Sequence, residues 1–251
     1  MEIAKTAFLE KIRRKELYIV SVIGVLIVII FGTGSGSLSL GGRPLTDYSL
    51  LAPVMMLTVN TVCCVLSSIM SVSTIPNEYE RKNSHLIWCR GISQRRYHLE
   101  LAVANVMAGL VSEAILFSAI ALFMISKSHT QELWKLIPAF LVMAINVVGV
   151  AVMTSAFSVV LPRIFAGALS VGITILGSFH GFLELVRDVL GGFAGGFFKV
   201  ILKIIPSYSA VGTAAGNVIG GNAIKIHSLL AGILVIYIFT VVIMIVKKKE
   251  A

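Results

Sequence analysis

The feature that most limits the fold of this chain is a series of long segments without Asp, Glu, Lys or Arg. A helix needs about 20 mostly apolar residues to cross the ~30 Å hydrocarbon core of a bilayer. Six segments reach about this length, and one of them is interrupted, by Glu113. They are Leu17 to Ser35, Ser49 to Ile75, Leu101 to Ser126, Leu136 to Pro162, Ile164 to Leu183 and Ile226 to Val246. The sequence therefore predicts an all-α integral membrane protein with six transmembrane helices in a single domain, residues 1–251.

Composition supports a lipid environment for most of the chain. Of the 251 residues, 57% are hydrophobic and 13% are charged, whereas about 25% of the residues of a soluble domain are charged. Disordered proteins are excluded as well, because they are poor in apolar residues and rich in charge. The three cysteines form neither a disulfide framework nor a C-x-x-C metal motif.

The basic residues predict which end of the bundle faces the cytoplasm. Fourteen of the 21 Lys and Arg residues lie in the N-terminal segment, after the second expected span, at Arg163 or at the C-terminus. Short cytoplasmic loops of membrane proteins carry an excess of Lys and Arg. We therefore expect a multi-pass protein of a bacterial plasma membrane with both termini in the cytoplasm. The net charge of +9 then reflects topology and attraction to anionic lipid, and we expect no nucleic-acid binding.

The first sixteen residues have the pattern of a helix that lies in the membrane interface. Apolar residues recur every three or four positions, at Ile3, Ala4, Ala7, Phe8 and Ile12, and charged residues fill the other faces. The segment lacks the cleavage site of a signal peptide. An amphipathic interfacial helix over 1–16 is the prediction, and a frayed basic tail is the alternative.

A search for catalytic motifs finds none. The chain has no G-x-x-x-x-G-K-[ST], no H-E-x-x-H and no G-x-S-x-G, the motifs of P-loop nucleotide binding, zinc peptidases and α/β-hydrolases. The five histidines are scattered over different loops and span ends. We therefore expect that the chain is not an enzyme and that it has no catalytic residue, metal or cofactor of its own.

The connection after the second expected span, residues 76–100, combines dense charge with aromatic residues. Protein interfaces are enriched in aromatic residues and Arg. We expect a short helix from about Glu78 to Cys89, ended by Gly91. The alternative is that Trp88 and Tyr97 belong to the aromatic belt that membrane proteins carry beside their cytoplasmic charges.

The order of an N-terminal interfacial helix, two spans, this connection and a third span resembles the permease subunits of type-2 ABC transporters. The connection opens with Glu78 to Arg81 and continues as Leu86-Ile-Trp-Cys-Arg-Gly-Ile-Ser-Gln-Arg-Arg-Tyr97. In that family it forms a coupling helix that sits in a groove of the ATPase subunit. This chain departs from the family pattern at Gly91, where Pro is usual, and at Gln94, where Arg is frequent.

The resemblance implies a dimer of permease chains, identical or related, embedded in membrane lipid and coupled to a cytoplasmic ABC ATPase that binds ATP and Mg. It implies export, and the small six-span members that this chain resembles export hydrophobic or amphipathic peptides or drugs. An integral-membrane enzyme acting on lipid or peptide and an ATP-independent secondary carrier are the alternatives. The residues expected to contact the ATPase are Glu78, Glu80, Arg81, His85, Leu86, Trp88 and Arg90.

The segment 177–225 is too interrupted by Pro and Gly to span, and too apolar for a free loop. Irregular backbone is not tolerated against lipid, so we expect it to be tucked against protein. The resemblance implies short extracellular re-entrant helices, which fit Glu184 to Leu190 and Phe197 to Ile205. The glycines between them, at 191, 192, 195 and 196, have G-x-x-x-G spacing, which more often serves close packing than ligand binding.

Glu113 is the acidic residue inside an expected span. A carboxylate at the centre of a bilayer costs about 2.5–3.5 kcal/mol on insertion scales. We therefore expect Glu113 to face the bundle interior, either protonated or hydrogen-bonded to a polar residue such as Asn60, Asn105 or Asn146. A role in the substrate path and a role as interhelical glue both fit this position.

Overall fold

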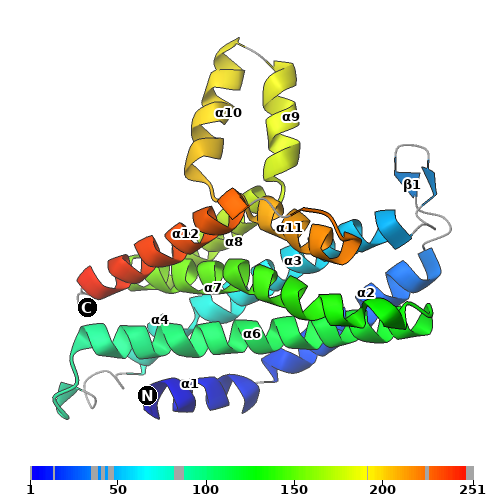
Figure 1. Ribbon diagram of the computed structural model, residues 1–251. Helices are drawn as coiled ribbons and strands as arrows, with labels where there is room; N and C mark the ends of the chain where they lie inside the picture. Colours follow the sequence, from blue (N-terminus) through cyan, green and yellow to red (C-terminus); the bar gives the residue numbers. More distant parts are fainter. Residues whose placement is uncertain are drawn as a thin grey trace.

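The computed structural model describes residues 2–13, 15–34, 39–40, 43–44, 48–81, 88–190, 192–223 and 226–246. Within these residues the protein is almost entirely helical (Figure 1). A two-residue strand, β1 (Ser39–Leu40), pairs antiparallel with β2 (Arg43–Pro44). The helices are α1 (Glu2–Arg13), α2 (Glu16–Gly34), α3 (Tyr48–Val72), α4 (Thr74–Glu80), α6 (Gln94–Ser126), η1 (Thr130–Lys135), α7 (Leu136–Val160), α8 (Arg163–Ser178), α9 (His180–Leu190), α10 (Gly192–Ile204), α11 (Tyr208–Gly220) and α12 (Ile226–Ile245).

The helices form an elongated bundle with two distinct ends (Figure 1). One end, called the terminal end below, carries α1, α4, the start of α6 and the end of α12. The opposite end, called the far end, carries the β1–β2 pair and η1. The core of the bundle is built from α3, α6 and α7, which pack against one another, and from α11, which packs against α3 and α7.

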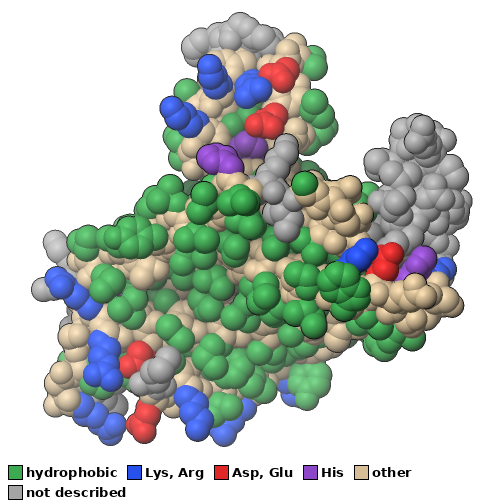
Figure 2. Space-filling model, viewed as in Figure 1, with side chains coloured by type: hydrophobic (Ala, Val, Ile, Leu, Met, Phe, Trp, Pro, Cys, Tyr) green, Lys and Arg blue, Asp and Glu red, His purple; other side chains and the backbone are tan. Residues whose placement is uncertain are grey.

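The surface and the helix lengths identify a membrane protein. Three helices are long and apolar enough to cross a membrane, at 53–80, 94–126 and 130–160. A fourth span is reached if α8 and α9, which meet at a bend of 70°, are counted together. The apolar stretches of α2 and α12 are shorter in the described residues. Figure 2 shows hydrophobic side chains covering the bundle between its ends, whereas Lys and Arg gather at the terminal end and on the hairpin of α9 and α10. Six spans remain a prediction.

Helix α1 lies along the first part of α6 at the terminal end. Its Ala4 is buried, and Ile3 and Ala7 pack against a small cluster that contains Ile75 and Tyr97. Lys11 is also buried, and its ammonium group donates a hydrogen bond to the carbonyl of Met70 on α3. This end of the chain is therefore an ordered helix, and its place in a membrane interface stays a prediction.

The late part of the chain differs from the expected tucked segment. Helices α9 and α10 form a hairpin that projects sideways from the bundle (Figure 1), and α10 packs mainly on α9. The segment held inside the bundle is α11, which lies against α3 and α7. Close packing explains this choice: a Cβ on Gly216 of α11 would lie 2.9 Å from the Cα of Pro53, so only glycine allows this approach.

Candidate functional site

The connection from α3 to α6 is held by a hydrogen-bonded group at the terminal end. Tyr79 Oη on α4 lies 2.7 Å from His98 Nε2 and accepts a hydrogen bond of 2.9 Å from Gln94 Nε2, both on α6. Tyr97 Oη donates to Glu78 Oε2 at 2.7 Å. We call these five residues the terminal platform. They join α4 to the first turn of α6, so the two helices are expected to move together.

Trp88 lies against the terminal platform. Its ring centroid is 6.1 Å from that of Tyr79, with the planes 64° apart. Gly91 follows with a φ of 75°, a left-handed backbone conformation that glycine adopts readily. The turn that begins at Trp88 therefore ends at Gly91. Ser93 then caps α6, because its hydroxyl accepts a hydrogen bond from the Arg96 amide. Of the helix expected from Glu78 to Cys89, residues 82–87 lie outside the described residues, and its first three residues belong to α4, Thr74–Glu80.

Charged side chains surround the platform at the surface. Glu80, Arg81 and Arg90 are exposed, and Arg81 Nη1 donates to Glu10 Oε1 of α1 at 2.8 Å. This hydrogen bond raises the pKa of the Arg81 guanidinium, which stays charged. His85 and Leu86, the other two residues expected to contact a partner, lie outside the described residues.

Asn60 and Asn146 meet deep inside the bundle. Asn146 Nδ2 donates to Asn60 Oδ1 at 2.9 Å. Both amides also donate to the backbone carbonyl of Tyr208, at 3.1 Å from Asn60 and 2.9 Å from Asn146. Asn60 and Asn146 are 0% and 2% exposed. We call these three residues the asparagine knot; it fixes the start of α11 between α3 and α7.

A second polar group lies nearer the terminal end and is centred on Asn105 of α6. Asn105 Nδ2 donates to Ser155 Oγ of α7 at 2.8 Å and to the Ser71 carbonyl of α3 at 3.3 Å. Its Oδ1 accepts a hydrogen bond of 2.6 Å from Thr74 Oγ1. The interfaces among α3, α6 and α7 are thus lined by satisfied polar groups, which is the usual way for membrane helices to hold polar residues.

Glu113 departs from this pattern, as does the buried Ser71 hydroxyl, which also lacks a hydrogen-bond partner among the described residues. Glu113 is 0% exposed, and neither of its carboxyl oxygens has a hydrogen-bond partner among the described residues. Its side chain faces the bundle interior, as the sequence indicated. None of the hydrogen bonds of Asn60, Asn105 or Asn146 reaches it. The expectation of an asparagine partner for Glu113 is therefore not met in this structure.

Two contacts of the site were not anticipated from the sequence. The carbonyl of Tyr208 belongs to a backbone that carries no residue-specific signal, and the bond from Lys11 to Met70 joins residues far apart in the chain. In the part of the chain that the structure describes, no group of three or more His, Cys, Asp or Glu side chains could hold a metal ion.

The fold and the site together define a helical membrane protein with a charged, aromatic terminal end and a polar interior. No protein-family model and no curated protein matches the sequence.

Proposed function

We propose that the chain is the transmembrane subunit of an ATP-driven ABC exporter. Two copies, or one copy and a related chain, form the path for hydrophobic or amphipathic peptides or drugs. Separate cytoplasmic ATPase subunits bind ATP and Mg and dock at the terminal end. In this proposal α2, α3, α6, α7, α8 and α12 are the six spans, α1 lies in the cytoplasmic interface, and the far end faces outward.

The observation that carries the proposal is the rigid attachment of the terminal platform to two long helices. One residue, Ser73, separates α4 from α3. Glu78 and Tyr79 of α4 accept hydrogen bonds from Tyr97 and Gln94, which tie α4 to the first turn of α6. A displacement of this connection by a bound partner is therefore transmitted to both α3 and α6. Because α3 also carries the asparagine knot, the same movement reaches α7 and α11.

The chemistry of the surface beside the platform suits a protein partner. Trp88 is half-buried, and Arg90, Arg95 and Arg96 are exposed. Interfaces use aromatic and Arg side chains as anchors, and charged groups around them steer association. This combination, together with the resemblance of residues 86–97 to a coupling segment, supports an ATPase as the partner.

The test is reconstitution with candidate ABC ATPase chains. The full-length chain is co-purified with each ATPase in nanodiscs, and association and ATP hydrolysis are compared for wild type and a Trp88→Ala, Arg90→Ala double variant. The matched control is Trp134→Ala, because Trp134 is an exposed tryptophan on η1 at the far end. We expect the double variant to lose most of the association and the control to keep it.

Two further results bear on the proposal. Arg90→Glu changes an exposed charge without removing the Trp88 ring, so it should weaken association even if Trp88→Ala disturbs the local fold. The proposal would be overturned if no ATPase associated with the chain. It would also be overturned if the Trp88→Ala, Arg90→Ala double variant and Arg90→Glu both associated as fully as wild type. Substrate movement without ATP would favour a secondary carrier instead, and turnover of lipid or peptide would favour a membrane enzyme.

A further inference from the structure

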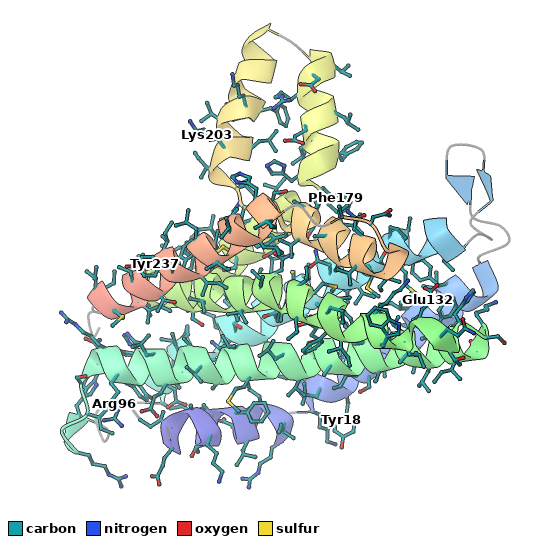
Figure 3. All side chains as sticks on the ribbon, viewed as in Figure 1. Tyr18, Arg96, Glu132, Phe179, Lys203 and Tyr237 are labelled. Carbon is teal, nitrogen blue, oxygen red and sulfur yellow. The ribbon has the colours of Figure 1, made fainter. Side chains whose placement is uncertain are left out.

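A pocket of about 640 Å³ lies at the foot of the projecting hairpin, between α9, α11 and α12. This volume is in the range of ligand sites, about 300–1,000 Å³. In Figure 2 the histidine side chains at the base of the hairpin mark this region, and the surrounding bundle surface is hydrophobic. Figure 3 labels Phe179, the residue between the end of α8 and the start of α9.

Polar side chains from three helices converge on this pocket. Helix α9 contributes His180 and Glu184, α11 contributes Ser209, Thr213 and Asn217, and α12 contributes His227. The residues on α9 are four positions apart, and so are those on α11, so each set lies along one face of its helix. A polar face beside hydrocarbon is costly unless it meets water or a polar ligand.

The polar side chains of the pocket determine what it can bind. His180 Nε2 lies 3.0 Å from the carbonyl oxygen of Leu202. A carbonyl oxygen only accepts hydrogen bonds, so Nε2 carries a proton and donates it to this carbonyl. The other ring nitrogen, Nδ1, is 3.7 Å from Glu184 Oε1. The Glu184 carboxylate, with the Ser209, Thr213 and Asn217 side chains on α11, favours a ligand that donates hydrogen bonds and carries positive charge.

The lengths of two helices fit a pocket at a membrane interface. Helix α8 has 16 residues from Arg163 to the bend, which is about 24 Å at about 1.5 Å per residue. From Ile245 near the terminal end back to His227, α12 covers about 27 Å on the same scale. Both lengths approach the ~30 Å thickness of the hydrocarbon core, which supports a pocket at the level where polar head groups meet acyl chains.

Exposed apolar side chains lie on two of the helices that line the pocket. Phe182 on α9 and Leu230 and Leu234 on α12 are 63%, 57% and 58% exposed. An alkyl chain can therefore lie along these helices while its head group occupies the polar pocket. We propose that this pocket binds the ammonium head of an amphiphile whose alkyl chain lies in the bilayer. Its use as a substrate site rests on the proposed function, whereas binding itself does not.

Binding is measured on the full-length chain in phosphatidylcholine nanodiscs without any ATPase. The probe is a radiolabelled long-chain primary alkylamine, and the competitors are the trimethylammonium and sulfate of the same chain length. We expect saturable binding, weaker competition by the trimethylammonium because it has no N–H donors, and no competition by the sulfate. Glu184→Gln should weaken binding about tenfold or more, as expected for loss of a charged hydrogen-bond partner.

The matched control is Asp188→Asn, one turn further along α9. Asp188 pairs with Arg187 at 2.7 Å and does not line the pocket, so its variant should bind within about twofold of wild type. Ala231→Phe fills the pocket without changing charge, should abolish binding, and replaces Glu184→Gln if that variant does not fold. Unchanged binding by the folded pocket variants, or equal competition by the sulfate, would overturn the proposal.

The binding experiment and the ATPase experiment fail independently. If the chain binds the amine through Glu184 but no ATPase associates, the proposed binding site stands and the proposed exporter function is wrong. If an ATPase associates but the amine does not bind, the exporter function stands and the proposed binding site is wrong.

Discussion

Asn146 Nδ2 donates a hydrogen bond of 2.9 Å to Asn60 Oδ1 and so joins two helices through residues 86 positions apart. The same two side chains donate to the carbonyl of Tyr208, the first residue of α11. Helices α3, α7 and α11 therefore share one fixed point inside the bundle. Because α3 continues almost directly into α4, this point is mechanically connected to the terminal platform.

Removal of Asn146 should loosen this fixed point. In Asn146→Leu, Asn60 Oδ1 and the Tyr208 carbonyl each lose a donor. We expect the free energy of unfolding to fall by about 1–2 kcal/mol, because two interhelical hydrogen bonds are lost and each contributes about 0.6 kcal/mol on average in a folded membrane protein, and at most about 1.7 kcal/mol. Unfolding in mixed micelles with increasing dodecyl sulfate, followed by circular dichroism, measures the change.

The control for this variant is Thr240→Val on α12. Thr240 Oγ1 donates to the Ile236 carbonyl of its own helix, so its loss removes no contact between helices. Equal stability of the two variants would show that the asparagine knot does not hold the bundle together.

Gly216→Ala should destabilise the packing of α11 on α3. The added Cβ would lie 2.9 Å from Pro53 Cα, and a backbone atom cannot move aside at low cost. Overpacking of this kind costs about 1–3 kcal/mol. Gly172→Ala on α8 is the matched control, because its Cβ would meet nothing within 4 Å and alanine is the better helix former by about 1 kcal/mol. In the same detergent unfolding assay, Gly216→Ala should therefore be less stable than wild type and Gly172→Ala more stable.

Glu113→Met should stabilise the protein. Both carboxyl oxygens of Glu113 lack a partner among the described residues, and an unsatisfied buried polar group costs about 1–3 kcal/mol. The same substitution at Glu100 should destabilise, because Glu100 Oε1 accepts a hydrogen bond of 3.1 Å from Arg96 Nε. A loss of stability in Glu113→Met would mean that the carboxyl group has a partner in the assembled protein.

Glu113→Gln separates a structural role from a functional one. The amide keeps the shape of the side chain, so the fold should be retained. Transport equal to wild type in a folded Glu113→Gln variant would exclude a role for the carboxyl group in the substrate path.

The long core helices could be predicted from the sequence because their signal is local. The charge-free runs 49–75 and 136–162 match α3 (Tyr48–Val72) and α7 (Leu136–Val160) closely. The run 164–183 hides a break, since α8 ends at Ser178 and α9 starts at His180. Absence of charge shows that a segment tolerates lipid, but it does not show whether the helix stays straight.

The late helices could not be placed because their contacts are not local. In the sequence, Gly212 and Gly216 look like helix breakers, whereas in the structure they allow α11 to approach Asn60 and Pro53 on α3. For the site, the polar residues of the spans were found, but their pairing was not. The partner of Asn60 and Asn146 is a backbone carbonyl at Tyr208, and only the tertiary fold brings it within reach.

The three cysteines allow the orientation of the bundle to be measured by thiol labelling. Cys63 and Cys64 are buried, and Cys89 beside the terminal platform is exposed. We expect a membrane-impermeant maleimide to label wild type once, in inverted vesicles and not in intact cells, and to leave Cys89→Ser unlabelled. The reverse pattern should hold for Cys89→Ser with Gln131→Cys, because Gln131 is exposed on η1 at the far end. Labelling of Cys89 from outside the cell would place the terminal end, and with it any docked ATPase, on the wrong side of the membrane.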